Sequence, residues 1–159
     1  MQHLKLLCFL FFLIYFTTRY IKKGLKKFFE EDKIEMPKLP NKSIALIAGA
    51  ILSIITSTFM VEKTMLVLNS AQFGIPDPIF NIDIGYYIFT KPFIEMILYY
   101  IIFVFAVLSI YIAIYYIAVF NIYFDGINIE TLKKNTVIKQ IIFNVMVIAL
   151  AIAGLTFVN

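Results

Sequence analysis

The side chains that could do chemistry in this sequence lie in one polar segment, residues 62–92, between two long apolar runs. Asp77 and Asp83 are the carboxylates at its centre. Such a pair could bind a cation or share acid–base work, but both roles normally need further ligands or a nucleophile nearby. Aspartates that neighbour Pro78 and Gly85 more often accept backbone N–H bonds in turns. We therefore expect this pair to shape the loop, and we expect no metal site.

Other reactive side chains are scarce. The only histidine, His3, and the only cysteine, Cys8, have no partners at metal-ligand spacing, and one cysteine cannot form an intramolecular disulfide. The sequence contains no phosphate-binding glycine loop, no His-Glu-x-x-His motif and no Gly-x-Ser-x-Gly motif. It therefore predicts a protein that is not an enzyme and that holds no cofactor.

Composition indicates where the chain resides. It is 62% hydrophobic and 15% charged, whereas soluble domains are roughly 45–50% apolar and about 25% charged. A soluble domain of 159 residues could not hide this much apolar surface, but lipid can accept it. The expected partner is the lipid bilayer, together with other membrane helices or a second copy of the chain. No nucleic acid is expected, and the sequence identifies no small-molecule substrate.

Four apolar runs are long enough to cross a bilayer, which takes about 20 residues. They are residues 4–20, 44–61, 93–120 and 137–158. Backbone groups in lipid must pair within their own segment, so each run should be helical. The sequence therefore predicts an all-α fold: a multi-pass transmembrane bundle of four helices, forming a single domain over residues 1–159. A structured loop, residues 62–92, joins the second and third helices.

Lysine and arginine predict the threading, because they collect on the cytoplasmic side of membrane proteins. They are dense in the connection 21–43, whereas residues 62–92 contain only Lys63 and Lys91. This puts 21–43 in the cytoplasm, 62–92 outside the cell membrane and both ends of the chain outside. Within 21–43, one helix face carries apolar residues, namely Ile21, Leu25, Phe28 and Phe29. That face predicts either a segment docked on an anionic leaflet or a plain anchor that only sets topology.

Small residues predict where helices touch. They recur every four positions in the second run, at Ala45, Gly49, Ser53 and Ser57, and again in the fourth run, at Ala149 and Ala153. This spacing lets helix backbones approach closely, although a stripe of small polar residues can also line a pore. Asn144 is the strongly polar side chain inside the fourth run. We expect it to bond a neighbouring helix, and a substrate site is the alternative.

The loop and its flanks resemble the bacterial membrane proteins grouped as uncharacterised protein family 0182. The resemblance rests on Phe73-Gly74, Asp77-Pro78-Ile79-Phe80, Asp83-Ile84-Gly85, Tyr87-Ile88-Phe89 and Pro92-Phe93. Three positions depart from the family pattern: Asn81 replaces a common Gly, Tyr86 a common Phe and Lys91 a common Leu. Members are much longer and carry a large extracytoplasmic region after their membrane helices. The resemblance implies that this chain corresponds to an N-terminal membrane portion of such a protein.

These observations favour a membrane-anchoring or interaction module of a larger envelope protein in the bacterial plasma membrane. The alternative is a component of a transporter or channel, for which the small-residue faces and Asn144 are the support. Against it, no Gly- or Pro-interrupted helix is visible at mid-membrane depth.

Overall fold

The computed structural model describes residues 2–31, 33, 35, 41–124 and 136–158, and within these ranges the fold is all-α, as predicted. The elements in chain order are α1 (Gln2–Glu31), α2 (Asn41–Leu68), the π-helical turn η1 (Tyr86–Thr90), α3 (Lys91–Tyr123) and α5 (Thr136–Val158). The predictions for residues 32, 34, 36–40 and 125–135 lie outside the described residues.

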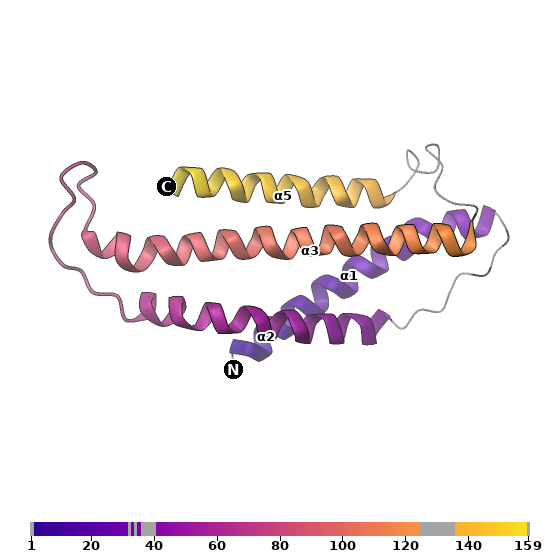
Figure 1. Ribbon diagram of the computed structural model, residues 1–159, viewed down its shortest axis with the longest axis horizontal. Coiled ribbons are helices and arrows are strands. Elements are labelled where there is room, and N and C mark those ends of the chain that lie inside the picture. The colour runs from indigo at the N-terminus through magenta and orange to yellow at the C-terminus, as the bar shows by residue number, and fades with distance from the viewer. Residues whose placement is uncertain (1, 32, 34, 36–40, 125–135, 159) are drawn as a thin grey trace.

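Three helices, α2, α3 and α5, run alongside one another, and α1 crosses them obliquely (Figure 1). Helix α1 packs mainly on α2, and α5 packs mainly on α3. The segment that joins α2 to α3 lies at one end of the bundle. The last residues of α1 and α3 and the first residues of α2 and α5 lie at the other end. This arrangement agrees with the alternation of connections that the lysines and arginines predict.

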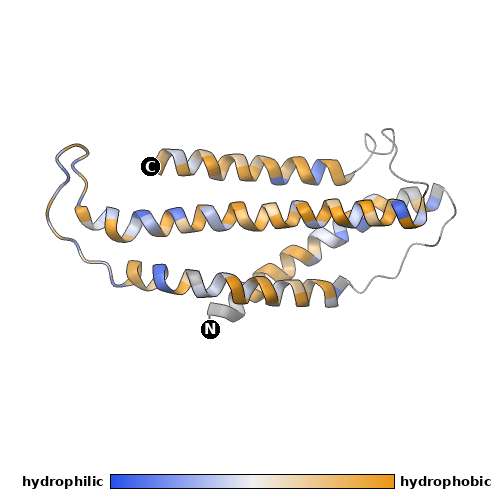
Figure 2. Cartoon of the chain, in the orientation of Figure 1, coloured by the Kyte–Doolittle hydropathy of each residue, from blue (hydrophilic) through white to orange (hydrophobic). Residues whose placement is uncertain are grey.

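Two helical segments are long and apolar enough to cross a membrane, Tyr86–Tyr123 and Val137–Val158. Hydrophobic residues cover α3 and α5 on most of their surface (Figure 2), so both contact lipid. A third span is formed if Lys42–Thr58 and Met60–Leu68 act together, although the two parts meet at 48°. By length and composition, the described residues thus provide two to three of the four predicted spans.

The bend in α2 has a cause in its hydroxyl side chains. Thr56 Oγ1 donates to the carbonyl of Leu52 at 2.7 Å, and both Ser57 and Thr58 donate to the carbonyl of Ile54. Hydroxyls that bond back to the preceding turn compete with the helical N–H bonds and bend the helix. The second apolar run therefore gives a helix that continues past residue 61 to Leu68 but changes direction near Thr58.

The apolar face of α1 beyond residue 20 packs on protein. Ile21, Leu25 and Phe29 are buried together with residues from the last turns of α3, among them Tyr116 and Phe120. Helix α3 has 33 residues, about 50 Å, whereas a bilayer core is about 30 Å thick. Its excess length provides the surface that α1 covers. Of the two alternatives for this face, docking on the leaflet is therefore wrong for these three residues, whereas the plain anchor stays a prediction; the side chain of Phe28 is outside the described part.

The small residues of α2 lie on its buried side. Ala45, Gly49, Ser53 and Ser57 are all buried. A Cβ atom added to Gly49 would stand 3.2 Å from the backbone nitrogen of Phe11 on α1. Backbone-to-backbone approach of this kind requires glycine, because a larger side chain would push the two helices apart.

The small residues of α5 differ from the expectation. Ala149 and Ala153 are exposed, so they do not pack against another helix of the described chain. Ala151 is buried, and a Cβ atom on Gly154 would lie 3.3 Å from Leu98 of α3. The face turned toward α3 is thus rotated from the one that the four-residue spacing suggested. Asn144, which bonds Ser109 on α3, lies on that face.

Replacing Gly49 with leucine should destabilise the contact between α1 and α2. The added side chain meets the backbone of Phe11, and overpacking of this kind costs about 1–3 kcal/mol. Thermal melting of the purified chain in detergent measures the effect. Ile51→Leu is the matched control, because Ile51 is 55% exposed on the same helix. Equal melting temperatures for the two variants would contradict the assigned helix contact.

Candidate functional site

The motif loop, residues 73–85, folds back on itself through backbone bonds. The Asp77 N–H donates to the carbonyl of Ile82 at 2.8 Å, and the Ile84 N–H donates to the carbonyl of Ile75 at 3.1 Å. Pro76 and Asp83 face each other in an isolated antiparallel bridge. The segment predicted as a structured loop is therefore a small closed hairpin.

Asp77 organises the tip of this hairpin. Its Oδ2 accepts the backbone N–H of Phe80 at 3.1 Å, and its carbonyl accepts the N–H of Asn81 at 2.9 Å. This is the geometry of a helix N-cap followed by one turn, with Pro78 at the first helical position, where its fixed φ suits the turn. Asn81 closes the turn at φ 55°, a conformation that glycine and asparagine tolerate best. The asparagine at this position is therefore a compatible replacement for glycine.

Asp83 holds the base of the hairpin together. Its Oδ1 accepts the N–H of Gly85 at 2.7 Å and that of Phe73 at 3.2 Å. Its Oδ2 accepts the N–H of Gly74 at 2.7 Å. One carboxylate thus joins the segment that enters the loop, at residues 73–74, to the start of the helical residues at 84–85. These three bonds, led by the one from Gly85, lower the pKa of Asp83 against a smaller opposing effect of desolvation.

Two further contacts seat the loop on η1. The rings of Phe73 and Phe89 stack with centroids 6.1 Å apart and planes 2° from parallel. A Cβ atom on Gly85 would lie 2.7 Å from the carbonyl oxygen of Ala71 and 2.9 Å from Asp83 Oδ1. Glycine is therefore required at position 85, because any side chain would displace the backbone that reaches Asp83.

The arrangement uses both carboxylates as acceptors for the chain's own backbone. Tyr87 Oη lies 3.5 Å from Asp77 Oδ2, longer than an ordinary hydroxyl bond. Within the described ranges no group of three or more His, Cys, Asp or Glu residues is placed to hold a metal. The chemistry that this geometry performs is the ordering of the loop backbone.

The loop presents apolar side chains outward although its backbone is closed. Phe73, Ile75, Ile79, Phe80 and Ile82 are all exposed, Ile79 to 80%. Large apolar side chains gathered on an ordered loop form a contact surface for protein or lipid. The remaining motif residues lie where the helical residues begin. Ile84 and Tyr87 lie in the first helical turn, and Pro92 lies in the first turn of α3, before Phe93.

Asn144 makes the interhelical bond expected of it. It is 3% exposed, and its Nδ2 donates to Ser109 Oγ on α3 at 3.2 Å. A second link, which the sequence reasoning missed, joins Thr18 Oγ1 on α1 to Tyr111 Oη on α3 at 3.0 Å. The signal for both partners was a hydroxyl inside an apolar run, which must find an acceptor or donor within the protein.

Comparison with known proteins adds the following. The family described as Uncharacterised protein family (UPF0182) matches residues 3–158. A UPF0182 protein of Caldicellulosiruptor saccharolyticus is 28% identical over 99 residues, which cover 60% of this chain and 11% of the relative. A UPF0182 protein of Clostridium novyi is 36% identical over 98 residues, covering 58% and 10%. The chain therefore spans about a tenth of the length of these curated relatives. No solved structure matches it.

Substitutions at the two aspartates should separate their roles. Asp77→Asn keeps one acceptor oxygen for Phe80 and should leave the loop intact. Asp83→Asn places an amide N–H₂ against one of its three N–H donors, so it should weaken the loop, and Asp83→Ala should do so further. We expect proteolysis of the loop in membranes to become roughly tenfold faster for Asp83→Asn, as for the loss of a charge-assisted bond. Equal resistance of Asp83→Ala and the unchanged protein would contradict this role.

The loop should also respond to acid in a defined direction. A carboxylate with a lowered folded-state pKa stabilises the fold above its unfolded pKa of about 3.9, and this contribution disappears as the pH falls through the folded value. Hydrogen-exchange protection of residues 73–85 should therefore be constant from neutral pH to about pH 4 and fall below it. Asp83→Asn should lack this acid step. A loss of protection that begins near neutral pH would point to a different group.

Proposed function

This chain belongs to the uncharacterised protein family UPF0182, and we propose that it is a membrane-anchoring and interaction module of a larger envelope protein. In this proposal the chain resides in the bacterial plasma membrane, and its motif loop is extracytoplasmic. The module performs no catalysis of its own. It holds a short ordered loop, residues 73–85, at a fixed distance from the outer surface of the bilayer.

The observation that carries the proposal is the contrast within the motif loop. Asp83 fixes the backbone through three N–H bonds, while large apolar side chains such as Ile79 and Phe80 remain exposed. An ordered backbone that displays apolar side chains suits a surface that another part of a protein covers. The matched relatives are about ten times longer than the matched segment. Other parts of such a protein could therefore pack on this surface.

The proposed threading has four spans, with α1 as the first. The basic residues that follow residue 18 support a cytoplasmic end for α1. Successive helices start at alternating ends of the bundle, as this threading requires (Figure 1). Residues 62–92 then lie outside, and the chain leaves the membrane on the outer side after α5.

The hydrogen bond that Asn144 makes between α3 and α5 favours an anchoring role over a transport role. Its amide nitrogen is engaged by Ser109, which in turn donates to the carbonyl of Phe105 at 2.8 Å. A substrate would have to displace this bond between α3 and α5. The arrangement therefore suits a fixed helix pair better than a transport site.

Cysteine labelling in intact cells tests the threading. In a Cys8→Ser background, Gln72→Cys should react with a membrane-impermeant maleimide and Ser43→Cys should react only after the cells are opened. Both positions are exposed, so the difference reports sidedness and not burial. The reverse pattern would overturn the topology.

The anchoring role is tested by reporter fusion. Alkaline phosphatase is active only outside the cytoplasm, so a fusion after Val158 should be active and resist extraction by carbonate. A fusion after Phe124 is the control and should be inactive. An inactive reporter after Val158 would exclude this chain as an anchor for extracytoplasmic material.

A further inference from the structure

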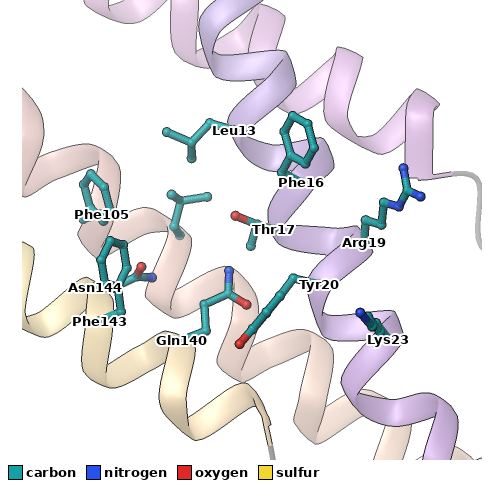
Figure 3. A pocket seen from close by; sticks show the side chains of 11 residues that line it. Leu13, Phe16, Thr17, Arg19, Tyr20, Lys23, Phe105, Gln140, Phe143 and Asn144 are labelled. Atoms are coloured by element: carbon teal, nitrogen blue, oxygen red, sulfur yellow. The ribbon is translucent and has the colours of Figure 1, made fainter.

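A groove of about 510 Å³ opens between α1, α3 and α5. Figure 3 shows that side chains from α1 and α5 converge on it, with Gln140 and Tyr20 directed toward the same space. The residues that line it are Leu13, Phe16, Thr17, Arg19, Tyr20, Lys23, Phe105, Leu108, Gln140, Phe143 and Asn144. The groove is therefore bounded by both polar and apolar groups.

The two kinds of lining residue are separated along the helices. Leu13 and Phe105 lie at mid-helix positions, whereas Lys23 lies near the basic end of α1 and Gln140 lies in the first turns of α5. From Leu13 to Lys23 helix α1 rises about 15 Å, half of a bilayer core of about 30 Å. Because α1 crosses the bundle obliquely, the groove reaches at most the depth of one leaflet, with cations at its headgroup end and rings toward its centre.

Gln140 supplies a polar group that lacks a partner. Its Oε1 atom is buried and has no hydrogen-bond partner among the described residues. A buried acceptor of this kind destabilises the fold unless a donor reaches it. Gln140 as a whole is only partly buried, so a rotation of its side chain would turn this oxygen into the groove, where an occupant that brings a hydroxyl would satisfy it. Arg19 and Lys23 are exposed at the same end, so this occupant should also carry negative charge.

We propose that the groove binds one anionic phospholipid whose headgroup carries hydroxyls, of the phosphatidylglycerol type. Arg19 and Lys23 hold the phosphate, Gln140 Oε1 accepts a headgroup hydroxyl, and one acyl chain lies against Phe16, Phe105 and Phe143. Basic pockets between membrane helices are suited to such headgroups. That this lipid comes from the inner leaflet rests on the threading proposed above, whereas binding itself does not.

Native mass spectrometry of the purified chain in detergent tests the site, and it is independent of the threading. Wild type should retain dioleoyl-phosphatidylglycerol at least tenfold more tightly than dioleoyl-phosphatidylcholine. The double variant Arg19→Gln/Lys23→Gln should lose this preference. Lys26→Gln/Lys42→Gln removes the same charge from exposed positions outside the groove and should keep it.

A second variant separates the headgroup hydroxyl from the charge. Gln140→Met should fold normally, since it removes an unpaired buried oxygen, and should still prefer anionic lipid. It should lose only the preference for phosphatidylglycerol over phosphatidylmethanol, which has the charge without the hydroxyls. The same melting temperature as wild type in lipid-free detergent checks its folding.

Three results would overturn the proposal. Equal losses in the two double variants would mean diffuse attraction to a basic surface. Equally tight retention of inorganic phosphate and of phosphatidylglycerol in the mass spectra would mean an anion site without a lipid. Retention of no lipid, with Tyr20→Cys in a Cys8→Ser background cross-linking to a second copy of the chain, would mean that a helix fills the groove.

Discussion

A polar group within hydrocarbon must find its partner inside the protein, and this constraint governs the arrangement of the bundle. Backbone groups meet it by forming helices. The hydroxyls of α2 meet it by bonding back to carbonyls of their own helix, and the helix bends as a result. Asn144 and Thr18 meet it across helices, through Ser109 and Tyr111 on α3. Because both bonds end on α3, that helix is the common reference for α1 and α5.

Excess helix length extends this organisation beyond the bilayer. Helix α3 continues past the thickness that a membrane needs, and α1 continues in one helix through the basic segment to Glu31. Their projecting turns bury Ile21, Leu25 and Phe29 of α1 against Tyr116 and Phe120. Lys23 and Lys26 of α1 are exposed, so their long side chains can reach a lipid surface. Protein packing and membrane contact therefore use opposite faces of the same segment.

Much of this could be predicted from the sequence, since period and composition are local properties. The helical class, the loop with its two structural aspartates as candidates, and the small-residue side of α2 follow from residues near one another. The rotation of α5 could not be predicted in the same way, since Asn144 and Ser109 are far apart in sequence. The packing of Ile21 and Leu25 on α3 was also hidden, because an amphipathic helix has the same pattern whether lipid or protein covers it. The lateral groove depends on three helices at once and has no local signal.

The motif loop and the third helix form one mechanical unit. Asp83 accepts the N–H of Gly85 at the first helical turn. Its negative charge there also interacts favourably with the positive end of the helix dipole. The same carboxylate accepts the N–H groups of Phe73 and Gly74 from the other side of the hairpin. A short bonded path therefore connects the exposed tip, at Ile79 and Phe80, to the start of η1 and α3. A loop held in this way keeps its apolar surface at a fixed position relative to α3, which a flexible tether of the same length could not do.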